Sequence, residues 1–285
     1  MPPEERTVIA QSRSDGYVTE PAWRVAAETL AMLGGVLYWA VFGLLFTIAG
    51  TVLHLLLPRR CGRRLGRHAL HWAFRVFVRY LDTTGLVHAD LRELERLRGP
   101  SSPRIIAPNH TSLWDAVFLI SRIPDCICIM KQSIQQNPFL GGGARLAGFI
   151  PNTGPSSLVR RASAALAEGG SLLLFPEGTR TRRSARWINP FKGGCALIAA
   201  HAAVPVQPVF IRSDSRYLEK GWPFYRRPRF PIRIHVSLGN PLTPTPGESV
   251  HDFTHRLQDL FEHELSRPHP LRRTGTELTT PHQTG

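Results

Sequence analysis

The chain has 285 residues, enough for one sizeable α/β domain with an appendage. Its 24 glycines and 24 prolines follow no collagen-like period, and its four cysteines form no C-x-x-C pair and are too few for a disulfide scaffold. We therefore expect reduced thiols in a cytosolic compartment. The formal net charge of +14 indicates an anionic partner, and composition alone leaves nucleic acid, an anionic membrane surface and a phosphorylated substrate open.

An uncharged segment in the N-terminal third favours the membrane among these partners. Residues 1 to about 20 are polar and irregular, which is typical of disordered chain. No Asp, Glu, Lys or Arg occurs between Glu28 and Arg59, and a helix of about 20 apolar residues can cross a bilayer. The segment is too long, and too far from the N-terminus, for an ordinary cleaved signal peptide. We expect a spanning or deeply inserted segment; the alternative is a buried helix pair in a soluble protein.

A basic segment follows directly, with arginines gathered in residues 59–67. By the positive-inside tendency this end faces the cytoplasm, and the rest of the chain does too. Each arginine near an anionic leaflet adds about 1 kcal/mol of attraction. Residues 68–81 alternate aromatic side chains with Arg75 and Arg79. This pattern predicts an amphipathic helix that lies at the lipid interface or packs on the globular domain.

Strands and helices alternate from about Thr83 onward, and this predicts a mixed, largely parallel sheet wrapped by helices. A short helix closed by Gly99 is expected first, and a later helix, residues 157–170, begins with a Ser cap. The last amphipathic helix, residues 248–267, is expected to cover the sheet. The other predicted elements are strands at 104–107, 126–130, 171–175, 204–211 and 232–238, and helices at 113–121, 137–148 and 193–203.

The first segment with chemical potential reads NHTSLWD and spans residues 109–115. His110 and Asp115 can meet if the histidine lies just before a helix and the aspartate lies in its first turn. A carboxylate beside an imidazole fixes its tautomer, so that the other ring nitrogen can take a proton from a hydroxyl. The structural alternative is a helix cap, because Ser112 followed by Asp115 is a capping-box-like pattern.

Two further segments suit an anion. FPEGTR, residues 175–180, follows a buried strand, and ligands of open α/β sheets bind at strand carboxyl ends. Gly178 permits a tight turn that exposes backbone N–H groups, and Arg180 offers a bidentate fork. NPFKGG, residues 189–194, brings Lys192 to a helix N-terminus. The alternatives are a β-turn with a surface ion pair and an ordinary loop with an exposed lysine.

Taken together, these segments resemble the lysophospholipid and glycerol-phosphate acyltransferase family. NHTSLWD is similar to the family's N-H-x-x-x-x-D block, and FPEGTR is similar to its F-P-E-G-T-R block. Residues 204–211 resemble the closing V-P-[IV]-x-P-[IV] strand, and FKGG looks like the segment between them. The four blocks occur in the family's order and spacing and cover roughly residues 83–240.

The resemblance implies roles for individual residues. His110 is implied as the general base and Asp115 as its orienting partner. The acceptor's head group is implied to bind at Glu177, Gly178, Thr179, Arg180 and Lys192. The donor is implied to be acyl-CoA or an acyl carrier protein, with no metal, no cofactor and no covalent acyl-enzyme, because the hydroxyl attacks the thioester directly.

These expectations describe an O-acyltransferase of phospholipid biosynthesis at the inner (cytoplasmic) membrane, with its catalytic domain facing the cytoplasm. Its expected partners are membrane lipids and the thioester donor rather than nucleic acid, and the oligomeric state is left open. The expected parts are a flexible N-terminus at 1–28, membrane-anchoring helices at 29–82, a catalytic domain at 83–266 and a disordered tail at 267–285.

One block departs from the family's pattern and bears on the acceptor. The family usually has G-x-[IVF]-F-[IV]-x-R between the two main motifs, whereas residues 147–152 read AGFIPN, with Asn152 where an arginine is expected. A lysophosphatidic-acid-like acceptor is the first expectation, with Arg145, Arg160 or Arg161 as replacement cations. The alternatives are a non-phosphate hydroxyl of an aminolipid, glycolipid or pigment, a thioesterase, and a catalytically silent membrane-anchored binding protein of the same fold.

Overall fold

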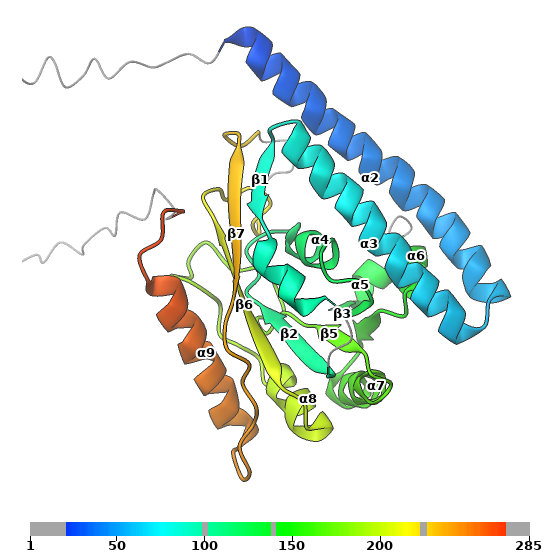
Figure 1. Cartoon of the computed structure of the whole chain (residues 1–285), viewed down its shortest axis with the longest axis vertical. Helices are drawn as coiled ribbons and strands as arrows, with labels where there is room; N and C mark the ends of the chain where they lie inside the picture. The colour runs from blue at the N-terminus through cyan, green and yellow to red at the C-terminus, as the bar shows by residue number, and fades with distance from the viewer. Residues whose placement is uncertain (1–20, 99–101, 138–140, 223–226, 272–285) are drawn as a thin grey trace, which may run out of the picture.

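A seven-stranded sheet with helices on both faces forms the body of the protein (Figure 1). The computed structural model describes residues 21–98, 102–137, 141–222 and 227–271. The strand order is β1-β7-β6-β2-β5-β3-β4, and all neighbours are parallel except the antiparallel pair β6 and β7. This confirms the mixed, largely parallel sheet. The strands are β1 (Val87–Asp90), β2 (Arg104–Pro108), β3 (Cys126–Lys131), β4 (Ile150–Asn152), β5 (Ser171–Leu173), β6 (Val206–Ser213) and β7 (Ile232–Leu238).

Both faces of the sheet are buried, which accounts for strands that are apolar without a polar face. Along β2, Ile105 contributes to the core on one face and Ile106 to the core on the other, as a period of two requires. Ile106 shares its core with Phe77 of α3, whereas Ile105 shares its core with Phe253 of α9. The helices are α2 (Ala22–Leu56), α3 (Arg59–Thr83), the 3-10 helix η1 (Arg92–Leu97), α4 (Asp115–Ile120), α5 (Gln132–Gln135), α6 (Gly141–Leu146), α7 (Pro155–Ala167), α8 (Gly194–Ala202) and α9 (Val250–Ser266).

Helix α2 is long and apolar enough, by length and composition, to cross a membrane. It lies along α3 and against α6 rather than standing away from the domain (Figure 1). A Cβ on Gly50 would lie 3.0 Å from the backbone of Gly142, so the backbones of α2 and α6 approach each other as closely as glycine allows. Tyr38 also donates a hydrogen bond to the carbonyl of Ala73 (2.8 Å), which fixes α2 against α3. One face of α2 is therefore committed to protein contacts, while its other face exposes apolar side chains.

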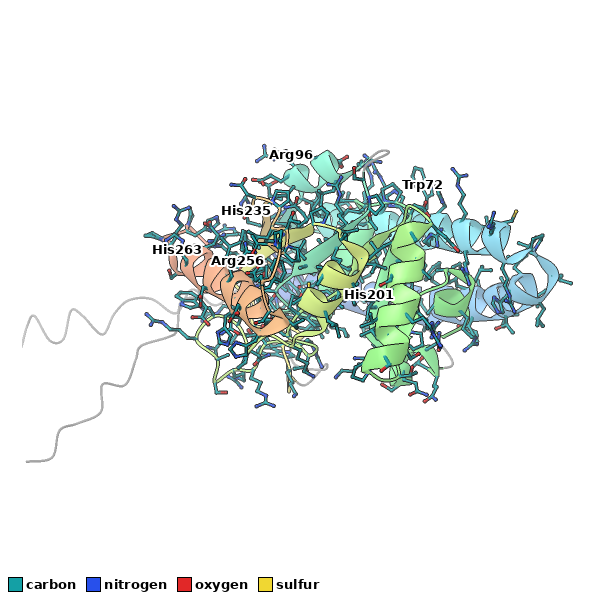
Figure 2. The ribbon with its side chains drawn as sticks, turned by 90° about the horizontal axis from the view of Figure 1, so that it is seen from below. Trp72, Arg96, His201, His235, Arg256 and His263 are labelled. Atoms are coloured by element: carbon teal, nitrogen blue, oxygen red, sulfur yellow. The ribbon has the colours of Figure 1, made fainter. Side chains whose placement is uncertain are left out.

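Helix α3 is amphipathic, as its sequence predicts. Phe77 and Leu81 are buried in the core of the domain. Trp72 lies at the surface of the same helix (Figure 2), with the guanidinium of Arg75 5.7 Å from its ring centroid. The helix thus packs on the domain with one face and presents an aromatic and basic face outside.

Several predicted boundaries need correction. Helix α2 begins at Ala22, so residues 22–28 are helical and not part of a flexible terminus; Glu28 is buried there and pairs with Arg24 (3.0 Å). Helix α7 has Gly154 as its N-cap and a proline at its first position, and not the expected Ser cap. The short strands β1 and β4 were not predicted. Gly99, residues 1–20 and most of the expected tail lie outside the described residues.

Candidate active site

The side chain of His110 lies between the end of β2 and the start of α4, where it meets Asp115. The Nδ1 atom of His110 is 2.9 Å from Oδ2 of Asp115, which is the first residue of α4 and only 1% exposed. The carboxylate also accepts hydrogen bonds from Ser112 N–H (2.8 Å) and Thr111 Oγ1 (3.2 Å). Because a carboxylate that accepts these bonds faces Nδ1, we assign the ring hydrogen to Nδ1 and the lone pair to Nε2.

The capping interpretation of this segment is correct in a modified form. Trp114, and not Ser112, is the N-cap of α4, and no side chain caps it. Asp115 instead turns back and accepts the N–H of Ser112, while Ser112 Oγ accepts from Trp114 N–H (3.3 Å). The same carboxylate therefore holds the turn and contacts the imidazole, so a structural role of Asp115 is compatible with the catalytic interpretation.

The imidazole of His110 is also fixed by a ring contact. It stacks on Phe175, the first residue of FPEGTR, with ring centroids 3.9 Å apart and an interplanar angle of 24°. Within the part of the chain that the structure describes, Nε2 makes no hydrogen bond. The protein thus holds one edge and one face of the imidazole ring.

Glu177 connects three segments through a buried carboxylate. It is 1% exposed, and the acceptor-binding role that the resemblance implies does not match this position. Burial raises the pKa of Glu177, and hydrogen bonds from the backbones of Asn189 and His110 oppose that effect. Its carboxylate faces the protein, so the geometry makes it a positioning residue for the backbone of His110. The donors to its oxygens are His110 N–H (2.8 Å), Thr181 Oγ1 (2.9 Å), Asn189 N–H (2.8 Å) and Asn189 Nδ2 (2.6 Å).

Arg180 joins the FPEGTR turn to the segment after β6. Its Nη1 donates to the carbonyls of Leu218 (2.7 Å) and Glu219 (3.2 Å). The carbonyl of Leu218 also accepts from Leu113 N–H (3.3 Å), and Leu218 has a φ of 61°, which is uncommon outside glycine. The guanidinium keeps donors at Nε and Nη2, which form no hydrogen bond in the described residues.

The turn at Gly178 brings Lys192 to the same place. Gly178 has a φ of 64°, and a Cβ there would lie 3.0 Å from Nζ of Lys192. The backbone N–H of Lys192 donates to the carbonyl of Pro176 (2.9 Å). The side chain of Lys192 is exposed and that of Thr179 is half-buried in this turn. The structure therefore gathers four of the five predicted acceptor residues at this turn with accessible side chains or backbone. Glu177 is the exception, because its carboxylate is buried.

Asn152 lies at the carboxyl end of β4, exposed and in register with Lys131 at the end of β3. Both strands run parallel to β5, which precedes FPEGTR, so these residues end at the same edge of the sheet as the active site. Two of the three expected replacement cations, Arg145 and Arg161, instead line a separate cavity. Lys131 is therefore the cation that the structure places opposite Asn152, and it was not predicted.

Three further polar residues of the site were not predicted: Asn109, Thr181 and Asn189. The amide of Asn109 accepts from Ile211 N–H (2.7 Å) and donates to the Ile211 carbonyl (2.9 Å), so it extends the pairing of β2 with β6. Thr181 N–H donates to the carbonyl of His110 (2.6 Å). Each lies in or beside a predicted motif, but the partner of Asn109 is 102 residues away, and no local pattern indicates it.

Comparisons with known proteins find acyltransferases of similar sequence. Residues 88–212 match the family model described as Acyltransferase. The chain is 31% identical over 137 residues to the chloroplastic 1-acyl-sn-glycerol-3-phosphate acyltransferase BAT2 of Brassica napus, covering 46% of this chain and 39% of that protein. It is 26% identical over 159 residues to the 1-acyl-sn-glycerol-3-phosphate acyltransferase of Pseudomonas aeruginosa, covering 54% and 58%. The chain thus spans less than two thirds of the length of these relatives.

A third relative and a solved structure extend the match. The chain is 30% identical over 198 residues to the putative 1-acyl-sn-glycerol-3-phosphate acyltransferase acl-2 of Caenorhabditis elegans, covering 66% of each protein. The crystal structure of the 1-acyl-sn-glycerophosphate (LPA) acyltransferase of Thermotoga maritima superposes with a TM-score of 0.64 at 18% identity, over 85% of this chain and 97% of that one, and shows the same fold. The family-model match contains the His110–Asp115 pair and the FPEGTR turn. Over residues 88–212, which are less than half of its length, the chain is therefore similar to the acyltransferase family.

Proposed function

We propose that this chain is a membrane-bound O-acyltransferase that moves a fatty acyl group from a thioester donor to the hydroxyl of a lysophosphatidic-acid-like lipid. The observation that carries the proposal is the hydrogen bond between Nδ1 of His110 and the buried carboxylate of Asp115. It leaves Nε2 as a base beside a turn that holds Arg180 and Lys192. The names of the relatives, 1-acyl-sn-glycerol-3-phosphate acyltransferases, support the acceptor class.

The proposed reaction is a single acyl transfer. Nε2 of His110 accepts the proton of the acceptor hydroxyl while its oxygen attacks the carbonyl carbon of the thioester. The carboxylate of Asp115 stabilises the imidazolium that results. When the C–S bond breaks, the sulfur leaves with the electron pair and takes the proton from the imidazolium. The products are an ester and a free thiol, and His110 returns to its neutral form.

The acceptor's phosphate is proposed to bind at the FPEGTR turn. A phosphate monoester carries nearly two negative charges, so more than one cation is needed to balance it. Arg180 offers its free Nε and Nη2 donors, and the ammonium of Lys192 lies over Gly178 in the same turn. Lys131 adds a cation near Asn152, where the family's arginine is missing. In this proposal Glu177 positions the catalytic histidine and does not contact the acceptor.

The apolar helix α2 is proposed to hold the enzyme at the cytoplasmic side of the inner membrane. Its outward face exposes Leu33, Leu37, Leu44 and Ile48, each about half exposed or more. The arginines of residues 59–67 follow directly, and such a cluster favours the cytoplasmic, anionic leaflet. The donor is proposed to be acyl-CoA or an acyl carrier protein.

The test is an acyl-transfer assay on the purified full chain with a thioester donor, with product identification. Lysophosphatidic acid, monoacylglycerol and water alone serve as acceptors. We expect phosphatidic acid, with thiol release that depends on lysophosphatidic acid and is lost in His110→Ala. Thiol release with free fatty acid in water alone would identify a thioesterase. Ester formed only from monoacylglycerol would show that the acceptor is uncharged. The observation that favours this alternative is Asn152, which stands where the family has an arginine.

A further inference from the structure

The turn from α2 into α3 lies at one end of the molecule, close to α6 (Figure 1). A basic cavity there is lined by residues of these helices and of α7. Its volume is about 270 Å³. Basic side chains from four helices line it: His54 of α2, Arg59 and Arg63 of α3, Arg145 of α6 and Arg161 of α7. Segments far apart in the sequence thus bring their cations to one place.

These cations have no acidic partner among the described residues. No carboxylate lines the cavity, and Arg59, Arg63, Arg145 and Arg161 form no ion pair in the described chain. Like charges gathered in this way repel one another, and an anion between them would offset that repulsion. The described part of the cavity therefore selects for a negatively charged ligand.

Two of the arginines are held in place by the fold. Nη1 of Arg145 donates to the carbonyl of Gln135 (2.9 Å). The stem of Arg63 lies on Gly148, where a Cβ would come within 2.9 Å of its Cγ and Cδ and where φ is 71°. Only glycine allows this approach, so the backbone seats the arginine. A preorganised pair of this kind loses less side-chain freedom when it binds a ligand.

The surroundings of the cavity indicate that the anion belongs to a lipid. Leu55 and Leu56 follow His54 directly and are 79% and 73% exposed. Exposed leucines beside clustered arginines are typical of a protein surface at the boundary between acyl chains and head groups. A lipid at this boundary places its phosphate beside the arginines and its chains along the leucines.

The cavity is separate from the active site. Its lining includes Gly148 and Phe149, which precede β4, and none of the proposed catalytic or acceptor residues. Strand β4 is separated from β2, which leads to His110, by β5 and β3. Neighbouring strands lie about 4.8 Å apart, so the start of β4 is on the order of 14 Å from the end of β2 at His110 across the sheet alone.

We propose that this cavity binds the phosphate group of an anionic membrane phospholipid. Arginine forks form charge-assisted hydrogen bonds to phosphate oxygens. A lipid bound there would connect the α2–α3 turn to α6 and α7 at the membrane surface. The inference does not depend on acyl transfer, because its test measures binding and not turnover.

The test titrates the intact chain, purified in a neutral detergent, with short-chain phosphatidylglycerol and follows the melting temperature. We expect a saturable rise for the wild type. Arg63→Gln with Arg161→Gln should weaken binding at least about tenfold, because a lost charge-assisted hydrogen bond alone weakens affinity by about that factor. The matched control, Arg64→Gln with Arg160→Gln, removes the same charge from adjacent residues that do not line the cavity. It should bind like the wild type.

Equal weakening in the two double variants would show diffuse attraction and overturn the proposal. Inorganic phosphate and short-chain diacylglycerol are titrated in the same way to identify the ligand. If inorganic phosphate raised the melting temperature as much as phosphatidylglycerol, a free anion would suffice. If diacylglycerol did so, the acyl chains would suffice, and either result would overturn the proposal of a lipid phosphate site. Arg63 packs on Gly148, so its replacement can also disturb the fold. The single variants Arg161→Gln and Arg160→Gln therefore repeat the comparison at two exposed positions of one helix. Unchanged binding in Lys192→Gln would support a site distinct from the acceptor turn, whereas loss of binding there would overturn it.

Discussion

Replacing Glu177 with glutamine keeps the shape of the side chain and removes one of its two acceptor oxygens. In the structure Oε1 accepts from His110 N–H, and Oε2 accepts from two donors of Asn189. A glutamine keeps the larger number of bonds when its oxygen faces Asn189, which turns its NH₂ group toward His110. Two donors then face each other at the backbone of the proposed catalytic base.

The size of the effect follows from these contacts. The N–H of His110 loses its acceptor in a partly buried place, which costs up to about 1–3 kcal/mol of unfolding free energy. The same repulsion displaces the imidazole from its alignment with Asp115, and a shift of about 1 Å can lower turnover about 10²-fold. We therefore expect Glu177→Gln to lower stability and kcat and to leave the acceptor KM nearly unchanged.

Thermal unfolding and initial rates of thiol release, measured at several acceptor concentrations, check this expectation. The matched control is Glu168→Gln, which removes the same charge from an exposed position after α7. If Glu177→Gln raised the acceptor KM strongly at unchanged kcat and stability, the positioning role would be refuted, because the carboxylate would then contact the acceptor.

The same residue gives a pH dependence with a defined sign. Burial raises the pKa of Glu177 above its ordinary value of 4.5. Between the ordinary pKa of the unfolded chain and the raised pKa of the folded protein, the folded protein binds more protons. The contribution of Glu177 to stability is therefore present below pH 4.5 and declines as the pH rises toward the raised pKa. Glu177→Gln cannot titrate, and its stability relative to the wild type should rise over that window. Parallel stability curves for the two proteins would contradict the reasoning.

Three further predictions concern the base, the acceptor and the membrane. His110→Ala should fold normally and lose about 10²–10⁴-fold in turnover, which far-UV circular dichroism and the transfer assay check together; wild-type activity would exclude His110 as the base. Arg180→Ala should raise the acceptor KM far more than the donor KM, and Asn152→Arg should preserve or improve the use of lysophosphatidic acid; steady-state kinetics with that acceptor would expose the opposite order. The intact chain should stay in the membrane fraction through a high-salt wash, because apolar contact and not charge anchors it, and quantitative extraction by salt would contradict this.

Local patterns predicted the parts of this protein that depend on neighbours in the chain. His110 and Asp115 are five positions apart, and their contact requires only a turn that leads into a helix. The strand at 232–238 was predicted with its exact bounds, because its alternation of buried and less buried residues is regular. By contrast, β4 has three residues, one of them a proline, and is too short to carry a period.

Contacts between distant segments could not be predicted in this way. The FPEGTR motif indicates a ligand site, but it does not indicate that Glu177 turns inward to the backbone of His110, 67 positions away. The Leu218 carbonyl that receives Arg180 and Leu113 belongs to a segment with no recognisable motif. Such contacts depend on the packing of the sheet, which brings the ends of separate strands together.

The close approach of α2 to α6 bears on how the chain reaches its native state. Residues 22–83 leave the ribosome before the sheet exists, with Phe77 and Leu81 lacking the core that later buries them. Gly50 likewise meets Gly142 only after about 90 further residues have been made. Synthesis therefore presents an apolar hairpin without its partners, and a bilayer surface can shelter that hairpin until β2 to β6 assemble against it. In the proposed membrane attachment, insertion of α2 and folding of the sheet are therefore steps of a single process.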